Sequence, residues 1–425
     1  MPMSTHDPRE HIRGIHQILI SDKKRIGFLF GAGSSLATGL KNVSVPAIER
    51  MTTSIVEAVK AHSREFSDAI QEIQNETELM RVSFNVETLL SSIEAKRAAI
   101  GAGKLNGLDS EAFATLAAVV KTNVVKLVSI HETLLANDRK EWAHARLANW
   151  VQKARRRFPA EIFTTNYDYL FEIALENSGI PYFDGFSGSY EPFFCPEAVE
   201  DVDAYPHLVK VWKMHGSLGW TYRGNAVIRK PSASADSILI YPSHLKYNAS
   251  KKQPYVGLID RLCAFLQQDD AVLFTCGYSF GDDHINERLV TSLRRGANSH
   301  VIAMYYDETK TNDNKVVFAL TDEANKVRHL ATHETGGKMS IYGVRHAIIG
   351  GKFGEWRLRD EPKTTEAIRV SQYFDEDAAT PSTEAGERKG DERWEGTGRF
   401  LLPDFRKLTD FLNELSSSEG PAIAI

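Results

Sequence analysis

A glycine-rich turn near the start of the chain has the residue types that bind a phosphate. In "GFLFGAGSSLATG", residues 27–39, an apolar stretch that predicts a buried strand is followed by Gly31, Ala32, Gly33 and Ser34. Ser34 or Ser35 stands where it could cap a helix, and N–H groups at a helix start point toward an anion. Leu36 takes the place of the third glycine of the dinucleotide fingerprint G-x-G-x-x-G. A nucleotide site and an ordinary tight turn therefore both fit this segment.

Three later segments place chemically useful side chains directly after apolar stretches that predict strands. They supply Thr165, Asn166 and Asp168 in "FTTNYD", His215 in "WKMHGS", and Gly277, Ser279 and Asp282 in "CGYSFGDD". An imidazole with an ordinary pKa of about 6.5 suits proton transfer near neutral pH. Together these segments could hold a phosphate, orient a ribose and move a proton.

Each of these residues also has a structural explanation. Asn166 and Asp168 could cap the helix predicted from "YDYLFEIAL", and a lone His215 could be a core histidine with satisfied hydrogen bonds. Asp282, Asp283 and His284 are consecutive and so are not spaced as metal ligands on one helix face. We expect the two aspartates at a helix N-terminus, with a secondary role for Asp282 at a ribose, and we predict no metal.

The elements that must position these residues read as an α/β fold with a Rossmann-like parallel sheet. Strands are predicted in "AEIFTTNYD", "LVKVWKMHGS", "DSILIYPS", "DAVLFTCGYSF" and "SHVIAMYYD", with helices such as "YVGLIDRLCAFLQQ" between them. Ligands of such sheets bind outside the carboxyl ends of the strands, which is where the polar residues fall.

The remaining sequence divides into two further units. Residues 46–155 carry apolar positions near the 3.6-residue period and predict a large helical insertion in a Rossmann-like domain of residues 1–45 and 156–310. Residues 311–425 predict a small α+β extension. In it, "KMSIYGVRHAIIGG" suggests a strand pair, the polar segment 375–398 a flexible loop, and "DFRKLTDFLNELSSS" a final amphipathic helix.

Composition narrows the class of protein. A formal net charge of −5 over 425 residues gives no general basic field for nucleic acid or for an anionic membrane. The three cysteines, Cys195, Cys263 and Cys276, are too far apart for C-x-x-C pairs, which argues against a disulfide framework and for a reducing compartment. We find no signal peptide and no apolar run approaching the length of a membrane span, so we expect a cytoplasmic protein.

Taken in order, the four motifs resemble the sirtuin family: the G-A-G-x-S turn, T-x-N-x-D, H-G and G-x-S. The resemblance implies an NAD site in which Gly31, Ala32, Gly33 and Ser34 cradle the pyrophosphate. The resemblance implies that Thr165 belongs to the NAD site, that Asn166 positions a water or a ribose hydroxyl, and that Asp168 lines the pocket for the nicotinamide amide. It makes His215 the general base and puts Gly277 and Ser279 at the adenosine side.

The chain departs from the protein-deacylating sirtuins at their peptide-handling features. Those enzymes carry a four-cysteine zinc ribbon after the H-G, and here only Cys263 and Cys276 lie between His215 and Gly277. Their peptide-docking strand has no counterpart in "YRGNAVIRKPSASADSILIYPS". The insertion, Asn85 and Glu87 in "NVETLL", and "GYSFGDDHI" are similar instead to a sirtuin-like branch of bacterial anti-phage defence. For Asn85 and Glu87 a solvated helix face is the structural alternative, and the resemblance would turn Glu87 toward the entrance of the site.

That branch implies a defined activity and partners. Its members hydrolyse NAD, giving nicotinamide and ADP-ribose, and some assemble with a HerA-type ATPase. The resemblance therefore implies an NAD hydrolase (NADase) that acts in antiviral defence by NAD depletion, as a homo-oligomer under a partner's control.

Other functions stay open on the sequence alone. An NAD-dependent ADP-ribosyltransferase or deacylase would use the same motifs. A non-catalytic module that senses NAD or ADP-ribose needs neither Asn166 nor His215. A nuclease has only Asp282 and Asp283 in its favour.

Overall fold

The computed structural model describes residues 4–41, 43–134, 141–230, 253–296, 298–311, 313–361, 369–376 and 395–416. Two predictions fall wholly or largely outside these ranges. They are the strand "DSILIYPS" at 236–243 and most of the loop at 375–398.

The described residues form a ten-stranded sheet with a parallel centre, which confirms the predicted α/β class. In spatial order its strands are β1 (Ser4–His6), β16 (Lys352–Trp356), β15 (His346–Ile349), β14 (Met339–Tyr342), β11 (His300–Met304), β10 (Ala271–Cys276), β2 (Arg25–Phe30), β3 (Glu161–Thr164), β7 (Val209–Lys213) and β4 (Tyr182–Phe183). The predicted strand pair at 338–351 is the antiparallel pair β14–β15.

The register of the central strands brings the four motifs to one edge. Phe30 at the end of β2 pairs with Cys276 of β10 on one side and with Thr164 of β3 on the other, and Thr164 pairs with Lys213 of β7. These four strands end at one level, so the residues that follow them meet there.

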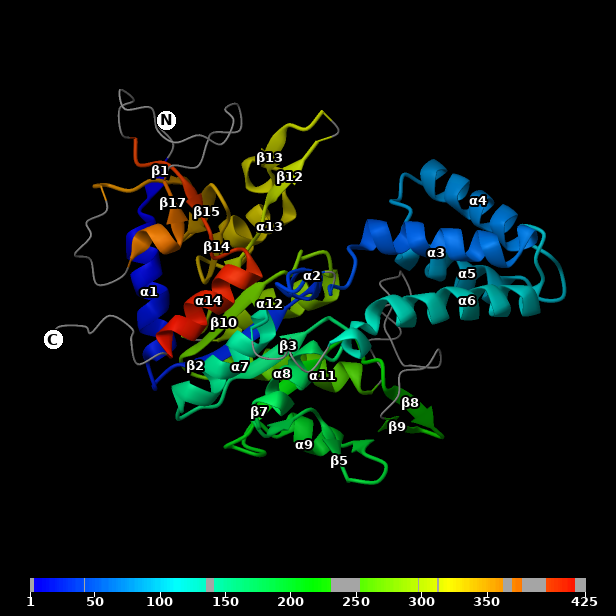
Figure 1. The fold of residues 1–425 in the computed structure, drawn as a ribbon, viewed down its shortest axis with the longest axis horizontal. Helices are drawn as coiled ribbons and strands as arrows, with labels where there is room; N and C mark the ends of the chain where they lie inside the picture. The colour runs from blue at the N-terminus through cyan, green and yellow to red at the C-terminus, as the bar shows by residue number, and fades with distance from the viewer. Residues whose placement is uncertain are drawn as a thin grey trace.

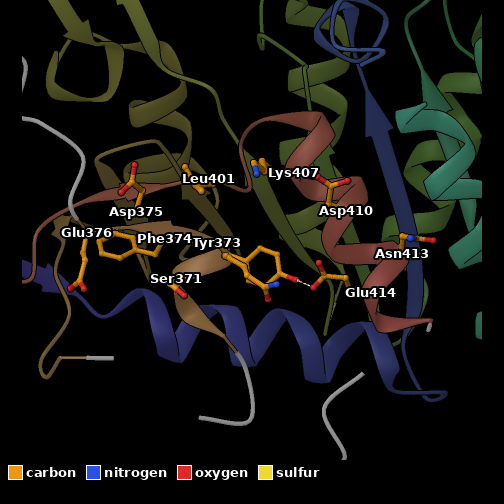
Figure 2. A pocket seen from close by; sticks show the side chains of 11 residues that line it. Ser371, Tyr373, Phe374, Asp375, Glu376, Leu401, Lys407, Asp410, Asn413 and Glu414 are labelled. Atoms are coloured by element: carbon orange, nitrogen blue, oxygen red, sulfur yellow. Dashed lines mark hydrogen bonds between the residues drawn. The ribbon is translucent and has the colours of Figure 1, made fainter. Parts of the chain in front are cut away.

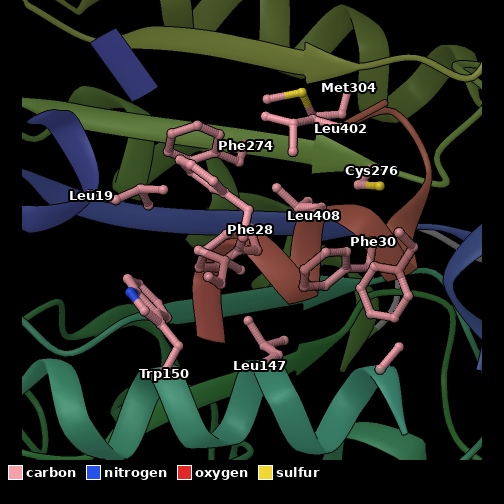
Figure 3. Packing of buried hydrophobic residues seen from close by; sticks show 14 of the residues in the cluster. Leu19, Phe28, Phe30, Leu147, Trp150, Phe274, Cys276, Met304, Leu402 and Leu408 are labelled. Carbon is pink, nitrogen blue, oxygen red and sulfur yellow. The ribbon is translucent and has the colours of Figure 1, made fainter. Parts of the chain in front are cut away.

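Helices cover both faces of the sheet because its strands are apolar on both sides. On one face lie α1 (Pro8–Ile20), α7 (Ala143–Ala154), α8 (Leu170–Asn177) and α14 (Phe405–Leu415). On the other lie α9 (Pro196–Glu200), α11 (Tyr255–Gln267), α12 (Asp283–Arg295) and α13 (Lys326–His329). Figure 3 shows the first layer, in which Phe28, Phe30 and Phe274 of the sheet pack against Leu147 and Trp150 of α7 and Leu408 of α14.

The helical insertion has a core of its own. It consists of α3 (Ile48–His62), α4 (Arg64–Leu79), α5 (Val86–Ala99) and α6 (Ser110–Val128), which lie together to one side of the sheet beyond the short helix α2 (Ala32–Leu36) (Figure 1). The predicted insertion 46–155 also included α7, but Trp142, Leu147 and Trp150 belong to the core of the sheet. An amphipathic period cannot tell which core a helix will join.

One helical segment in the described part of the chain, Ser110–Thr133, is long and apolar enough by length and composition to cross a membrane. This differs from our expectation that no run approaches that length. Its α6 portion buries Phe113, Leu116, Val120 and Val124 in the core of the insertion. Core helices of soluble proteins pass the same test, so the feature is weak evidence for a membrane span.

Among the described residues after 310, three strands extend the sheet, and the helix α14 packs on one of its faces. β14, β15 and β16 extend it, and α14 packs against α7. The remaining strands form small sheets: β5 (Phe186–Ser187), β6 (Phe193–Phe194), β9 (Ala226–Arg229) and β8 (Trp220–Arg223) in one, β12 (Glu308–Lys310) with β13 (Val316–Phe318), and β17 (Phe374–Asp375) with β18 (Arg399–Phe400).

Candidate active site

The glycines of the first and last motifs hold two turns in direct backbone contact. The N–H of Gly33 donates to the carbonyl of Gly277 at 3.0 Å, and the N–H of Gly31 donates to that of Cys276 at 3.3 Å. A Cβ on Gly33 would lie 2.6 Å from the Cα of Gly277, and Gly277 has a φ of +65°. Larger residues would push the two turns apart.

This contact corrects the predicted role of the turn. The N–H groups of Gly31 and Gly33 already donate to protein carbonyls, so they do not both point at an anion. Neither Ser34 nor Ser35 caps α2, because both lie inside it and Gly31 occupies the N-cap position. The glycines are explained by the close approach of the β2 and β10 turns.

Asn166 fastens the β3 turn to the glycine turn. Its amide nitrogen lies 2.7 Å from Oγ of Ser35, 3.0 Å from Oγ of Ser34 and 3.0 Å from the carbonyl of Gly31. The hydroxyl of Ser35 donates to Asp168 at 2.5 Å. Ser35 was not among the predicted site residues; the second serine of "GAGSS" was the only signal for it.

Asp168 also binds the first N–H group of α8, although Tyr169 and not Asp168 occupies the N-cap position. Its Oδ1 accepts a hydrogen bond from the N–H of Leu170 at 3.0 Å, at the start of α8. The other oxygen accepts from Ser35, so one carboxylate ties α8 to the glycine turn. The structural and the functional interpretations of Asp168 are therefore compatible.

Lys213, which was not a predicted site residue, is a buried lysine that bonds to the backbone of this network. It is only 2% exposed, forms an ion pair with Glu172 at 2.8 Å, and donates to the carbonyls of Tyr167 and Asp168. Burial raises the pKa of the Glu172 carboxyl, while the nearby ammonium of Lys213 acts in the opposite direction. This buried pair fixes the backbone that carries Asp168.

His215 and Asp282 form a buried pair at the same edge of the sheet. Nε2 of His215 lies 2.9 Å from Oδ2 of Asp282, and the two side chains are 9% and 7% exposed. Asp282 occupies the N-cap position of α12, as predicted, but its side chain does not cap the helix. The carboxylate meets the imidazole instead, an arrangement that sets the tautomer and orientation of a general base.

The loop that carries Asp282 is held by α12 itself. The hydroxyl of Tyr278 donates to Oδ1 of Asn286 at 3.1 Å, and Nδ2 of Asn286 donates to the carbonyl of Phe280 at 2.7 Å. Phe280 has a φ of 58°, so the backbone turns sharply here. The position of Asp282 is thus determined by packing around the loop.

A cavity of about 480 Å³ brings nearly all of the predicted residues together. Those that line it are Gly31, Ala32, Gly33, Thr165, Asn166, Asp168, His215, Gly277, Ser279 and Asp282. Ser34 lies behind this surface and is fully buried. Thr165 is anchored by its N–H, which donates to the carbonyl of Phe30 at 3.1 Å.

Residues 160–329 match the family model of the SIR2-like domain. No curated protein matches the chain. The matched range begins at β3 and ends at α13, so it includes Asn166, His215 and Asp282 but neither the glycine turn nor the insertion. The match supports placement in the sirtuin-like superfamily and, in general terms, an NAD-related activity.

The insertion forms the opposite wall of this cavity. The first turns of α3 and α5 and the end of α6 contribute Ile48, Met51, Val86, Glu87, Val124 and Val128. Asn85 does not line this cavity; its side chain caps α5 by accepting from the N–H groups of Glu87 and Thr88. The wall is mostly apolar, whereas the sheet side is mostly polar.

A separate cavity of about 500 Å³ lies beside α14 and contains none of the predicted residues. Figure 2 shows Asp375, Glu376, Asp410 and Glu414 around it, with the hydroxyl of Tyr373 hydrogen-bonded to Glu414. Among the described residues that line it, Lys407 is the one cation. Four carboxylates make this cavity unsuitable for an anionic dinucleotide.

Proposed function

We propose that this chain hydrolyses NAD to nicotinamide and ADP-ribose. The observation that carries the proposal is that one cavity joins the His215–Asp282 pair to Asn166 and the glycine turn. The match of residues 160–329 to a SIR2-like domain supports NAD as the bound nucleotide.

The reaction replaces the bond from ribose C1′ to the nicotinamide nitrogen by a bond to water. The bonding electrons leave with the ring, which becomes neutral nicotinamide, and the ribose passes through an oxocarbenium-like state. His215 takes the proton of the attacking water, and Asp282 stabilises the resulting imidazolium. Asn166 keeps the turn beneath the reacting ribose in place and orients the water.

Two observations favour water over a protein side chain as the acceptor. The helices of the insertion line the side of the cavity opposite the sheet with a mostly apolar wall. After His215 the chain also runs into β8 and β9 of a small sheet, in place of the zinc ribbon that deacylating sirtuins carry. Both features support a small acceptor.

We further propose a biological setting that rests on the resemblance described above. The chain acts in the cytoplasm as an antiviral effector that depletes NAD, assembled as a homo-oligomer and controlled by a HerA-type ATPase. Because α3, α5 and α6 line the cavity, a partner bound to the insertion could change access to His215.

The test is chromatography of NAD incubated with the purified chain, without acylated peptide. We expect nicotinamide and ADP-ribose in equal amounts, and a loss of roughly 10²- to 10⁴-fold in His215→Ala, the range for removal of a general base. His207→Ala, at an exposed histidine, is the matched control. NAD consumption that requires an acylated peptide, or transfer of labelled ADP-ribose to protein, would overturn hydrolysis. If NAD stays intact, the assay is repeated with a candidate ATPase, and intact NAD there too would refute the proposal.

A further inference from the structure

A second cavity, of about 740 Å³, adjoins the first across the contact between the glycine turns. Both cavities are lined by Gly33, Leu36, Gly277, Tyr278 and Ser279. They therefore lie on either side of the Gly33–Gly277 contact, and together they follow the carboxyl edge of the sheet from β7 toward β11. Two adjoining compartments suit a ligand with two halves joined in the middle.

The far compartment is completed by two pairs of residues: Tyr305 and Tyr306 lie inside the matched range 160–329, and Asp404 and Arg406 lie outside it. Tyr305 and Tyr306 follow β11, and Asp404 and Arg406 stand at the start of α14. Leu36 and Tyr306 are large apolar side chains that are nevertheless 48% and 53% exposed. Exposed apolar surface inside a cavity fits the flat face of a nucleobase.

Charge in this compartment is concentrated in one pair. Oδ2 of Asp404 lies 2.8 Å from Nη2 of Arg406, and Oδ1 lies 3.3 Å from Nε of the same guanidinium. Oδ1 also accepts from the N–H of Arg406 at 2.8 Å, which caps α14. The guanidinium is thus neutralised by its neighbour, while the carboxylate keeps lone pairs for a further donor.

We propose that Asp404 recognises the 2′-hydroxyl of the adenosine ribose and so makes the site select NAD over NADP. The inference rests on the dinucleotide site of the proposed function. A carboxylate accepts a hydrogen bond from a ribose hydroxyl, as in other dinucleotide sites, whereas a 2′-phosphate would bring close to two negative charges against it.

The test measures binding of two probes that the chain does not consume, ADP-ribose and 2′-phospho-ADP-ribose, by calorimetry on the full chain. We expect ADP-ribose to bind at least about tenfold more tightly, the effect of one hydrogen bond to a charged group. In Asp404→Asn the preference should fall to within about threefold, because Arg406 becomes available to the phosphate. Asparagine also caps helices well, so α14 should remain folded.

Two further variants sharpen the outcome. Asp404→Asn combined with Arg406→Gln should lose the gain in 2′-phospho-ADP-ribose affinity. Asp109→Asn, at an exposed aspartate that caps α6, should keep the wild-type preference. Equal affinities in the wild type, an unchanged preference in Asp404→Asn, or no binding of either probe would overturn the inference. The NAD assay tests hydrolysis separately from this inference. A chain that prefers ADP-ribose but leaves NAD intact would contradict hydrolysis and leave the role of Asp404 standing.

Discussion

The two walls of the cavity are built in different ways. On the sheet side, Asn166, Ser35, Asp168 and Lys213 form a continuous buried hydrogen-bond network between the ends of β2, β3 and β7. On the insertion side, apolar residues from three helix ends meet the cavity. The polar side chains on the sheet side need specific hydrogen-bond partners, so the sheet determines the positions of the reacting groups. The apolar contacts on the insertion side tolerate substitution, so the insertion determines access to the cavity.

The largest expected loss of stability comes from removing the buried lysine that supports the sheet side of the cavity. Lys213→Met removes the partner of buried Glu172, and an uncompensated buried charge costs about 3–5 kcal/mol of unfolding free energy. Urea unfolding measures the loss. Lys24→Met, at a more exposed ion pair with Asp270, should cost no more than about 1 kcal/mol. Equal losses in the two variants would show that the Lys213–Glu172 pair does not support the site.

Acid should weaken the sheet body through a buried histidine on α7. His144 is fully buried among Trp142, Phe171 and Phe405, and burial lowers its pKa to about 3. The unfolded chain binds this proton near pH 6.5, so stability falls as the pH drops below that value. Between pH 7 and 5 His144 alone accounts for a loss of about 2 kcal/mol of unfolding free energy, and His144→Phe should remove that contribution.

The control for this prediction lies in the insertion. His62→Phe is the matched control, because it replaces an exposed histidine of α3 by the same side chain. Unfolding midpoints measured at pH 7, 6 and 5 compare the variants. A wild-type slope retained in His144→Phe would contradict the assignment.

Asp282→Asn should affect the rate more than binding. An amide orients His215 less well and does not stabilise an imidazolium, so we expect kcat to fall about tenfold with KM within about twofold. Asp283→Asn is the matched control, since that side chain is exposed and pairs with Lys326. A similar drop in both variants would point to disturbance of α12 and not to an effect on His215.

The smallest expected effect tests the insertion wall. Met51→Ala removes apolar surface from the cavity without touching His215, so KM for NAD should rise about threefold while kcat stays within about twofold. Met80→Ala, at an exposed methionine of the same insertion, should change neither value. A larger fall in kcat for Met51→Ala would show that the insertion takes part in the chemistry.

The strands, and the edge of the sheet at which the site forms, could be predicted from the sequence. β2, β3, β7 and β10 are short, mostly apolar runs, and each is followed by polar or glycine residues that meet at the cavity. The prediction from sequence was wrong where one local pattern is compatible with two different tertiary arrangements. The period of α7 does not reveal which core it joins, and Asp282 looks like a helix cap because it occupies the cap position.

The sequence by itself determined the α/β class and the collection of motifs at the carboxyl ends of the strands, because apolar runs and small turn residues act locally and parallel strands end together. Only the tertiary structure decided that Gly33 faces Gly277, that His215 faces Asp282, and that Lys213 lies beneath Asp168. These contacts join segments far apart in the chain. They depend on how turns of neighbouring strands pack against one another, which no local pattern encodes.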